Sequence, residues 1–484
     1  MGLLGILLAL GLLMWLAYRG WSILLLAPAA ALLAAAISRE PLLASWTQTF
    51  MGSAAQFFAQ FFPLFLLGAV FGKLMDDSGS VAAIADFMTA RLGNGRAVLA
   101  VVLAGALVTY GGVSLFVALF VLAPMAQAMF RSAGIPRRLM PATVGLGTLT
   151  FTMSAFPGTP AIQNAIPMPF FGTTPFAAPG LGIIASLIML GFGLWWLSRA
   201  EAKARLAGEG FGAADDVSVE RVAGDPLIRE QVTLAREFDP AEITHGQHSK
   251  TTPPIGVAVL PIAVVIGVNL LMSLVVLPRL DSAFLAEPRW GATTVSGVLG
   301  VWSVAVALAA AIATLVATNR GRLPALRDSM DAGANASALP ILSVASLVGF
   351  GAVVASLPAF ATVREAVLSI GGGPLVSLAV ATNVLAALTG SASGGMTIAL
   401  DALGATYLTL AAERGIDPAL LHRVAVIASG TLDTLPHNGA IVTLLAVCGT
   451  THRESYFDIV MVAIVGAILA LVAVIVLGTA FGSF

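Results

Sequence analysis

The chain alternates long apolar runs with short polar segments, and eight of the runs are each long enough to cross a membrane as a helix. A bilayer core of about 30 Å takes about 20 apolar residues in helical form. The runs fall at 1–17, 21–37, 53–74, 178–198, 254–277, 291–318, 335–357 and 455–481. They predict an all-α polytopic membrane protein.

Two further regions, 97–171 and 373–449, are apolar overall but are interrupted repeatedly by Gly, Pro, Ser, Thr and Asn. Lipid cannot satisfy the backbone groups that such residues release. Interrupted helices are tolerated at membrane depth only where they are buried in protein or line a wet cavity. We therefore expect each region to contain a re-entrant hairpin followed by a broken helix, with two full spans in place of the hairpin as the alternative.

A hydrophilic stretch divides the chain into a first membrane repeat, 1–198, a connector, 199–253, and a second repeat, 254–484. The connector carries seven Lys/Arg and ten Asp/Glu. With the connector in the cytoplasm, 18 of the 24 basic residues fall on the cytoplasmic side, and Arg423 falls in an outer loop. This bias agrees with the positive-inside rule and predicts that the second repeat is inverted relative to the first.

Two pairs of matching strings support the repeat. The string GTLTFTMSAFPGTPAI from Gly147 matches GTLDTLPHNGAI from Gly430 with a four-residue gap, and Gly111-Gly112 matches Gly394-Gly395. Both pairs have an offset of 283 residues. Inverted repeats with broken helices are typical of secondary transporters, which bind substrate where the repeats meet.

The composition excludes several other classes of protein. Apolar residues make up 58% of the chain, and the net charge is −1 without a Lys/Arg cluster, so nucleic acid is not an expected partner. The single Cys448 excludes a disulfide framework and a cysteine-bound metal cluster. His245 and His248 of the connector are too few for a metal site, and no cofactor or metal is expected.

The tips of the two expected hairpins are the first candidate site. Glycine allows close backbone approach, while the next half-helix offers unpaired N–H groups to a carboxylate. Ser and Thr add hydroxyl donors. The candidate residues are Tyr110, Gly111, Gly112 and Ser114 in the first tip, and Ser391, Ser393, Gly394, Gly395 and Thr397 in the second. The plainer explanation is that small residues here let helices pack closely.

The two breaks are the second candidate site. Proline frees a carbonyl in the preceding turn, so Phe156-Pro157-Gly158-Thr159-Pro160 and Leu435-Pro436-His437-Asn438-Gly439 offer oxygen ligands on one side and amide donors on the other. Gly158, Thr159, His437 and Asn438 are candidate ligands. Asn164 is a candidate too, or else forms an interhelical hydrogen bond. A simple proline kink remains the alternative at both breaks.

Asp401, Asp433 and His437 are the candidates for proton coupling. A lone carboxylate at membrane depth has to be protonated, paired or hydrated, and histidine titrates near neutral pH. Asp401 could instead lie at the outer interface and pair with Arg414 or Arg423, and His437 could form a structural hydrogen bond.

The string Gly390-Ser391-Ala392 in one broken region, with a matching Gly/Ser tip in the other, resembles the gluconate permease (GntP) family of the ion-transporter superfamily. The resemblance implies an elevator-type carrier, often dimeric, that moves a hydroxy acid or sugar acid with protons. The tips and breaks would form its substrate site. Gluconate carriers tend to have Pro-Pro-His-Pro-Gly-Pro at the first break and Ser-His-Val-Asn-Asp-Ser-Gly at the second. The less polar breaks of this chain favour a smaller acid.

The sequence thus predicts a proton-coupled symporter for a small organic anion, multi-pass in a bacterial-type inner membrane. Sodium coupling is the first alternative. A proton-translocating subunit is disfavoured because Lys73, Lys203 and Lys250 lie at interfaces or in the connector. A membrane-embedded enzyme is disfavoured because no nucleophile motif accompanies Asp433 and His437.

Overall fold

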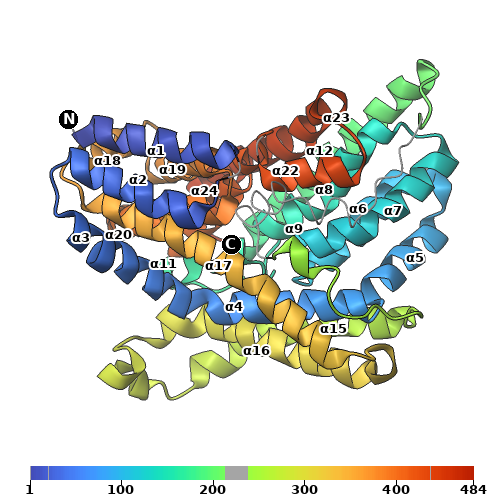
Figure 1. Ribbon diagram of the computed structural model, residues 1–484, viewed down its shortest axis with the longest axis horizontal. Coiled ribbons are helices and arrows are strands. Elements are labelled where there is room, and N and C mark those ends of the chain that lie inside the picture. Colours follow the sequence, from blue (N-terminus) through green and yellow to red (C-terminus); the bar gives the residue numbers. More distant parts are fainter. Residues whose placement is uncertain (1, 20, 213–237, 437) are drawn as a thin grey trace.

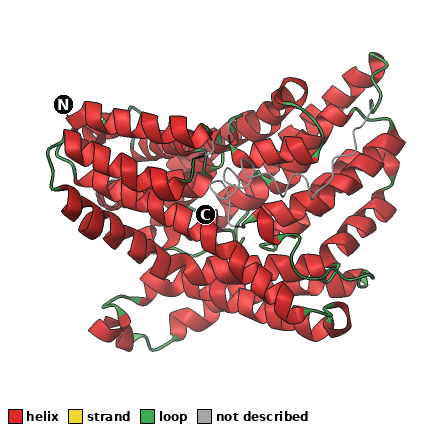
Figure 2. Ribbon diagram, viewed as in Figure 1, coloured by secondary structure: helices red, strands yellow, loops and turns green. Residues whose placement is uncertain are grey.

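The computed structural model describes residues 2–19, 21–212, 238–436 and 438–484. Within these ranges every regular element is a helix (Figure 2). Seven of the helices are long and apolar enough to cross a membrane. The expectation of a polytopic all-α membrane protein is confirmed.

The long helices coincide with the expected apolar runs. They are α1 (Gly2–Tyr18), α2 (Ile23–Ile37), α4 (Met51–Asp77), α12 (Pro179–Leu206), α15 (Ile255–Leu271), α16 (Val295–Thr318), α17 (Leu326–Ser356) and α24 (Gly466–Phe481). Helix α4 continues α3 (Leu42–Ala44) and η1 (Ser45–Phe50), and α24 continues α23 (His452–Ile459) and η11 (Val460–Val465). Shorter helices α5 (Ser80–Leu92) and α18 (Phe360–Leu368) follow α4 and α17.

Helices α4 and α17 pack against each other along much of their lengths (Figure 1). A Cβ atom added to Gly333 would lie 2.7 Å from Val70 Cα, and one added to Gly349 would lie 2.8 Å from Phe50 O. The contacting residues follow one another in opposite order along the two helices, so the helices are antiparallel. Small residues at these positions let the two backbones touch.

Both interrupted regions begin with a helical hairpin. The first joins α6 (Ala97–Tyr110) to α7 (Leu115–Ala133), and the second joins α19 (Pro374–Thr389) to α20 (Ala392–Arg414). Figure 1 shows the first hairpin on the right of the molecule and the second on the left. The second turn lies at Gly390 and Ser391, so Gly394 and Gly395 belong to the first turn of α20 rather than to the tip itself.

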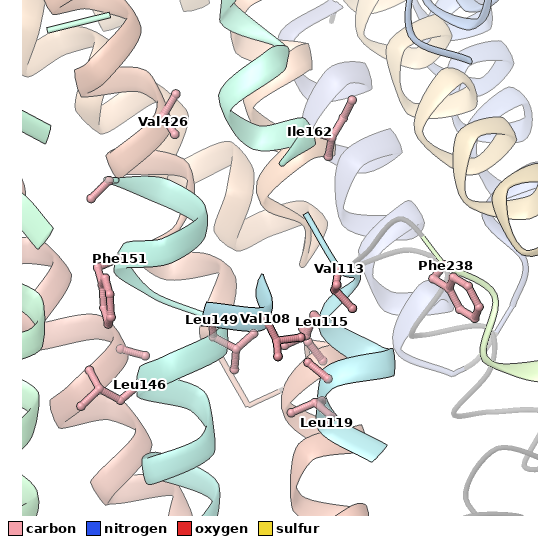
Figure 3. Packing of buried hydrophobic residues seen from close by; sticks show 14 of the residues in the cluster. Val108, Val113, Leu115, Leu119, Leu146, Leu149, Phe151, Ile162, Phe238 and Val426 are labelled. Carbon is pink, nitrogen blue, oxygen red and sulfur yellow. The ribbon is translucent and has the colours of Figure 1, made fainter. Parts of the chain in front are cut away.

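A broken helix follows each hairpin. The first consists of α8 (Met140–Thr148), α9 (Phe151–Ser154), α10 (Ile162–Ala165) and α11 (Pro167–Phe171), and the second of α21 (Pro418–Ser429), η10 (Leu432–Thr434) and α22 (Gly439–Val447). The breaks are 155–161 and 435–438. Helix α9 has four residues, the length of the gap between the two matching strings. Figure 3 shows Val108, Leu115 and Leu149 side by side in the core, so the first hairpin and the junction between α8 and α9 share one apolar cluster.

The connector ends by packing onto the membrane helices. Phe238 is completely buried, and the Asp239 N–H donates to Ala336 O of α17 at 2.8 Å. The Lys73 ammonium of α4 donates to Ile243 O at 2.8 Å and to Asp77 Oδ1 at 2.9 Å. Lys73 is therefore a buried ion-pair partner.

The assignment of Arg423 to an outer loop is wrong. Arg423 lies within α21 and has no exposed surface. The expectation assumed that a charged residue is exposed and therefore lies in a loop. Helix α21 is instead buried along Leu420–Ser429.

Candidate functional site

The first hairpin tip is hydrogen-bonded to the first break. The Tyr110 hydroxyl donates to Pro157 O at 2.9 Å, and its ring packs edge-on against Phe156 with centroids 4.8 Å apart. One residue earlier, Thr109 Oγ1 lies 3.1 Å from Thr152 Oγ1. The Pro157 carbonyl thus accepts a hydrogen bond from a side chain of the hairpin.

Asn164 stabilises the shape of the first break. Its side-chain nitrogen donates to Thr159 O and Pro175 O, both at 3.0 Å, and its oxygen lies 3.2 Å from His422 Nε2. Asn164 has no exposed surface. Both amide hydrogens are therefore already used within the protein.

Arg423 stabilises the same break from the second half of the chain. Its Nη1 donates to Ala155 O at 3.0 Å, while Nε and Nη2 donate to Ala177 O at 3.1 and 2.6 Å. Among the described residues no carboxylate lies within ion-pair distance of this guanidinium. An arginine without a nearby acid leaves net positive charge in the interior beside the break.

The second tip and the second break are connected in the same way. Asn438 Nδ2 donates to Gly390 O at 2.7 Å, and Asn438 Oδ1 accepts the Ala440 N–H at 2.7 Å, which caps α22. Ser391 Oγ accepts the Gly394 N–H at 3.1 Å and caps α20. His437 lies outside the described residues.

The interrupted helices of the two halves touch each other at helix ends that lie just before the two breaks. A Cβ atom added to Gly430, at the end of α21, would lie 2.8 Å from Ser154 Cβ and 3.1 Å from its hydroxyl. Ser154 ends α9 directly before the first break. The interrupted helices of the two halves therefore meet in the protein interior.

Two polar side chains near the first break have no hydrogen-bond partner among the described residues. Both side-chain atoms of Gln163 are unpaired although the residue is 1% exposed, and the Ser114 hydroxyl at the start of α7 is unpaired as well. Ser114 lines a cavity of about 20 Å³ together with Thr109, Gly112, Val113, Leu115, Met153 and Ala161. An unpaired buried amide costs about 1–3 kcal/mol, so Gln163 is a strong candidate for contact with a polar ligand.

Several candidate glycines are required by packing. A Cβ atom on Gly111 would lie 2.8 Å from Ile262 Cγ1, and one on Gly112, at φ 92°, would lie 2.6 Å from Pro160 Cγ. A Cβ atom on Gly158, at φ 83°, would overlap the Phe176 ring, and one on Gly395 would overlap the Ala386 backbone. These contacts hold both tips in place whether or not the same glycines approach a ligand.

The two candidate carboxylates lie in different surroundings. Asp433 is buried in η10 beside the second break. Asp401 is exposed and lines a separate polar cavity of about 200 Å³ between α4 and α20. In the described part of the chain, Asp401 forms no ion pair with Arg414 or Arg423, so the outer-interface pairing is not observed.

The predicted ligands Ser393 and Thr397 lie on the buried side of α20. Thr397 Oγ1 donates to Ser393 O at 2.7 Å, and Ser393 Oγ lies 3.3 Å from Ser391 Oγ. Thr159 Oγ1 of the first break accepts the Ala161 N–H at 3.3 Å.

Sequence reasoning missed His422 and Asn269. His422 has no exposed surface and contacts Thr173 Oγ1 at 2.6 Å, and Asn269 of α15 donates to Gly158 O at 3.0 Å. Asn269 is a lone amide in an apolar span, which was an available signal. His422 and Arg423 interrupt the apolar run from Leu420 to Ile427, which was another.

One group of side chains has the spacing of metal ligands. Atoms of Asp76, Asp77 and His248 lie within 4.8 Å of one another. The Lys73 ammonium, 2.9 Å from Asp77 Oδ1, already supplies the positive charge there. The hydrogen bond to Asp76 raises the pKa of His248, so a protonated imidazole also fits this place without a metal.

Comparison with known proteins agrees with this architecture. A family model described as GntP family permease matches residues 1–172. The chain is also 40% identical, over 483 residues and 98% of each chain, to a Bacillus subtilis (strain 168) protein named as the uncharacterized transporter YxjC.

Proposed function

This chain belongs to the GntP family of permeases, and from that premise we propose that it is a secondary active transporter that carries a small organic anion together with protons. Family membership makes it a membrane transporter rather than an enzyme. The substrate class proposed here is a hydroxy acid, sugar acid or related carboxylate.

The contact between Ser154 and Gly430 is the observation that carries this proposal. It joins two buried helix interruptions, one from each half of the chain. Helix ends that meet inside a membrane protein expose amide donors to a substrate. Lipid could not stabilise such a junction.

The chemistry of the junction favours an anion. Arg423 contributes positive charge beside the first break, and Gln163 and Ser114 contribute unpaired polar groups. We assign substrate contacts to these three residues as well as to the tip and break residues predicted from the sequence. In this conformation the cavity beside Ser114 is near the size of one water molecule, so entry of an acid requires the tip to move.

The hairpins support an alternating-access mechanism of the elevator type. They lie on opposite sides of the molecule (Figure 1), as expected for inverted repeats. The antiparallel pair α4 and α17 is suited to be the static element, with the hairpins and broken helices as the moving body. A homodimer in a bacterial inner membrane, with the connector in the cytoplasm, completes the proposal.

Asp433 is assigned to proton coupling because it is buried beside the second break, and Asp401 because it lies in a polar cavity. Sodium remains the second candidate, since carboxylate and hydroxyl oxygens also suit a hard cation.

Uptake by purified protein in liposomes tests the function. Labelled short hydroxy acids and sugar acids are offered under an imposed proton gradient, an imposed sodium gradient or neither. We expect concentrative uptake of at least one acid that collapses when a protonophore removes the proton gradient. Uptake driven by sodium alone would contradict proton coupling, and transport of none of the acids would contradict the substrate class.

A further inference from the structure

The cavity beside Asp401 lies between two facing rows of polar side chains. On α4, Ser53, Gln56 and Gln60 are spaced three and four residues apart and so share one face of the helix. On α20, Ser393, Thr397 and Asp401 are each four residues apart and share another. Ser53, Gln56, Gln60, Thr397 and Asp401 line the cavity, with Phe57, Phe61, Pro169, Phe170 and Val348.

The amide and carboxylate groups of this cavity are not used in the described part of the fold. Gln56, Gln60 and Asp401 form no hydrogen bond or ion pair with another described residue, and Gln56 and Asp401 are exposed. All three lie within helices that are long and apolar enough to span a membrane. Polar side chains are costly at such positions unless they face water. The cavity is therefore hydrated.

Asp401 determines the charge that the cavity accepts. It is the single charged side chain among the described residues that line the cavity, and the facing elements α4, α11 and α17 contribute amides, hydroxyls, aromatic rings and aliphatic groups. An unpaired carboxylate repels an organic anion and attracts a cation. The oxygen atoms around it are those that hydronium and alkali metal ions prefer.

Hydroxyl side chains on α20 lead from the cavity to the second hairpin tip. Thr397 lies one turn from Asp401 and donates to Ser393 O at 2.7 Å, and Ser393 in turn contacts Ser391. Lys73, which binds the connector, lies about 25 Å from Gln56 along α4 at 1.5 Å per residue. The cavity thus lies toward the membrane side opposite the connector.

We propose that this cavity is a cation vestibule: the coupled cation enters between α4 and α20, is held at Asp401, and passes along the Thr397–Ser393 face to the second tip. The proposal depends on the proposed function in one respect only, namely that the cation bound here is the one that drives transport. The occupant is a small hydrophilic cation, either hydronium or an alkali metal ion.

Thiol labelling tests the vestibule without measuring transport. In a Cys448→Ala background, Gln60→Cys and Gln56→Cys are each treated in intact cells with cationic and anionic membrane-impermeant thiosulfonates. We expect both variants to react several-fold faster with the cationic reagent, after correction for the reagents' rates with a free thiol. Adding Asp401→Asn should remove this preference.

Ala59→Cys is the matched control, because Ala59 is exposed on the same helix but does not line the cavity. We expect it to stay unlabelled. Lack of reaction at both Gln56→Cys and Gln60→Cys, or a cation preference that survives Asp401→Asn, would overturn the vestibule.

The same reaction distinguishes the two cations. All measurements are made at constant ionic strength. When protons occupy the cavity, acidification should lower the ratio of the cationic to the anionic labelling rate toward the value found with Asp401→Asn, and sodium should have no effect. Sodium as the occupant predicts the same fall when sodium replaces choline at fixed pH. A ratio that responds to neither refutes cation binding at Asp401. Because labelling needs no substrate, failure of the uptake assay would leave this result interpretable.

Discussion

His422 Nε2 lies 3.2 Å from the side-chain oxygen of Asn164, in a hydrogen bond that joins the two halves of the chain beside the first break. Both Asn164 amide hydrogens donate to backbone carbonyls, so its oxygen faces His422 and the neutral imidazole carries its hydrogen on Nε2. The Thr173 hydroxyl then donates to Nδ1 at 2.6 Å. The break is consequently held in one shape by contacts from both halves.

Asn164→Leu should destabilise the protein. The substitution leaves Thr159 O, Pro175 O and His422 Nε2 without their partner, and unpaired buried groups cost about 1–3 kcal/mol each. We expect a loss on the order of 2–5 kcal/mol, seen as a lower melting temperature of the purified protein. An unchanged melting temperature would show that the break does not depend on this amide.

Gln163→Leu should slow transport without destabilising the protein. The Gln163 amide has no partner among the described residues, so replacing it with an apolar side chain of similar size removes an unmet polar group. We expect an unchanged or higher melting temperature but at least tenfold slower uptake, because the proposed substrate contact is lost. A variant as unstable as Asn164→Leu, or one that transports normally, would contradict this role.

Arg423→Lys should separate charge from geometry. Lysine keeps the positive charge but cannot place a planar fork on both Ala155 O and Ala177 O. We expect folded protein with at least tenfold slower uptake, whereas Arg423→Met should yield little folded protein on size-exclusion chromatography. Normal uptake by Arg423→Met would show that the buried cation is dispensable.

The contact between the connector and α4 should weaken at higher pH. The hydrogen bond that the His248 imidazole donates to Asp76 raises the pKa of His248. The charges of Asp76 and Asp77 raise it further, while burial and the charge of Lys73 lower it. A raised folded-state pKa stabilises the protein fully below the unfolded value of about 6.5, and this contribution is lost as the pH rises through the raised value.

Melting temperatures of wild type and His248→Gln measured across this pH range test the contact. We expect the advantage of wild type to be largest at the acidic end and to shrink toward alkaline pH. His245→Gln is the control, since the exposed His245 side chain pairs with Glu242 rather than with a residue of α4 in the described part of the chain. An advantage of wild type that grows with pH would contradict the assignment.

Neighbouring glycines in the second hairpin should differ sharply in their tolerance of alanine. A Cβ atom at Gly395 would overlap the Ala386 backbone, whereas one at Gly394 would meet the end of the flexible Leu347 side chain at 2.7 Å. We expect Gly394→Ala to fold and Gly395→Ala to lose most folded protein in a detergent-stability assay. Equal tolerance of both would mean that α19 and α20 are not packed this closely.

The helices and breaks were predictable because their causes are local. Twenty apolar residues in a row favour a spanning helix, and Pro157 and Pro436 cannot continue one. The register of the second tip was not predictable from the matching Gly-Gly strings. The turn forms instead at Gly390, in the left-handed region at φ 63°, and at Ser391, which caps α20.

Burial of individual polar residues could not be predicted from sequence. Arg423 and the loop arginines carry the same charge, and only the packing around α21 distinguishes them. The docking of Phe238 and Lys73 depends on tertiary contacts between the connector and two helices. The role proposed for Gln56 and Gln60 depends on their position opposite Asp401, which follows from the packing of α4 and not from the sequence.

Hydrogen–deuterium exchange with the acid identified in the uptake assay is the most direct test of the central claim, that the two meeting helix interruptions bind the substrate. We predict that saturating acid slows amide exchange across 155–164 and 431–441, the two segments that contain the breaks, and leaves the connector unchanged. Protection confined to other segments, or to one break alone, would contradict the account.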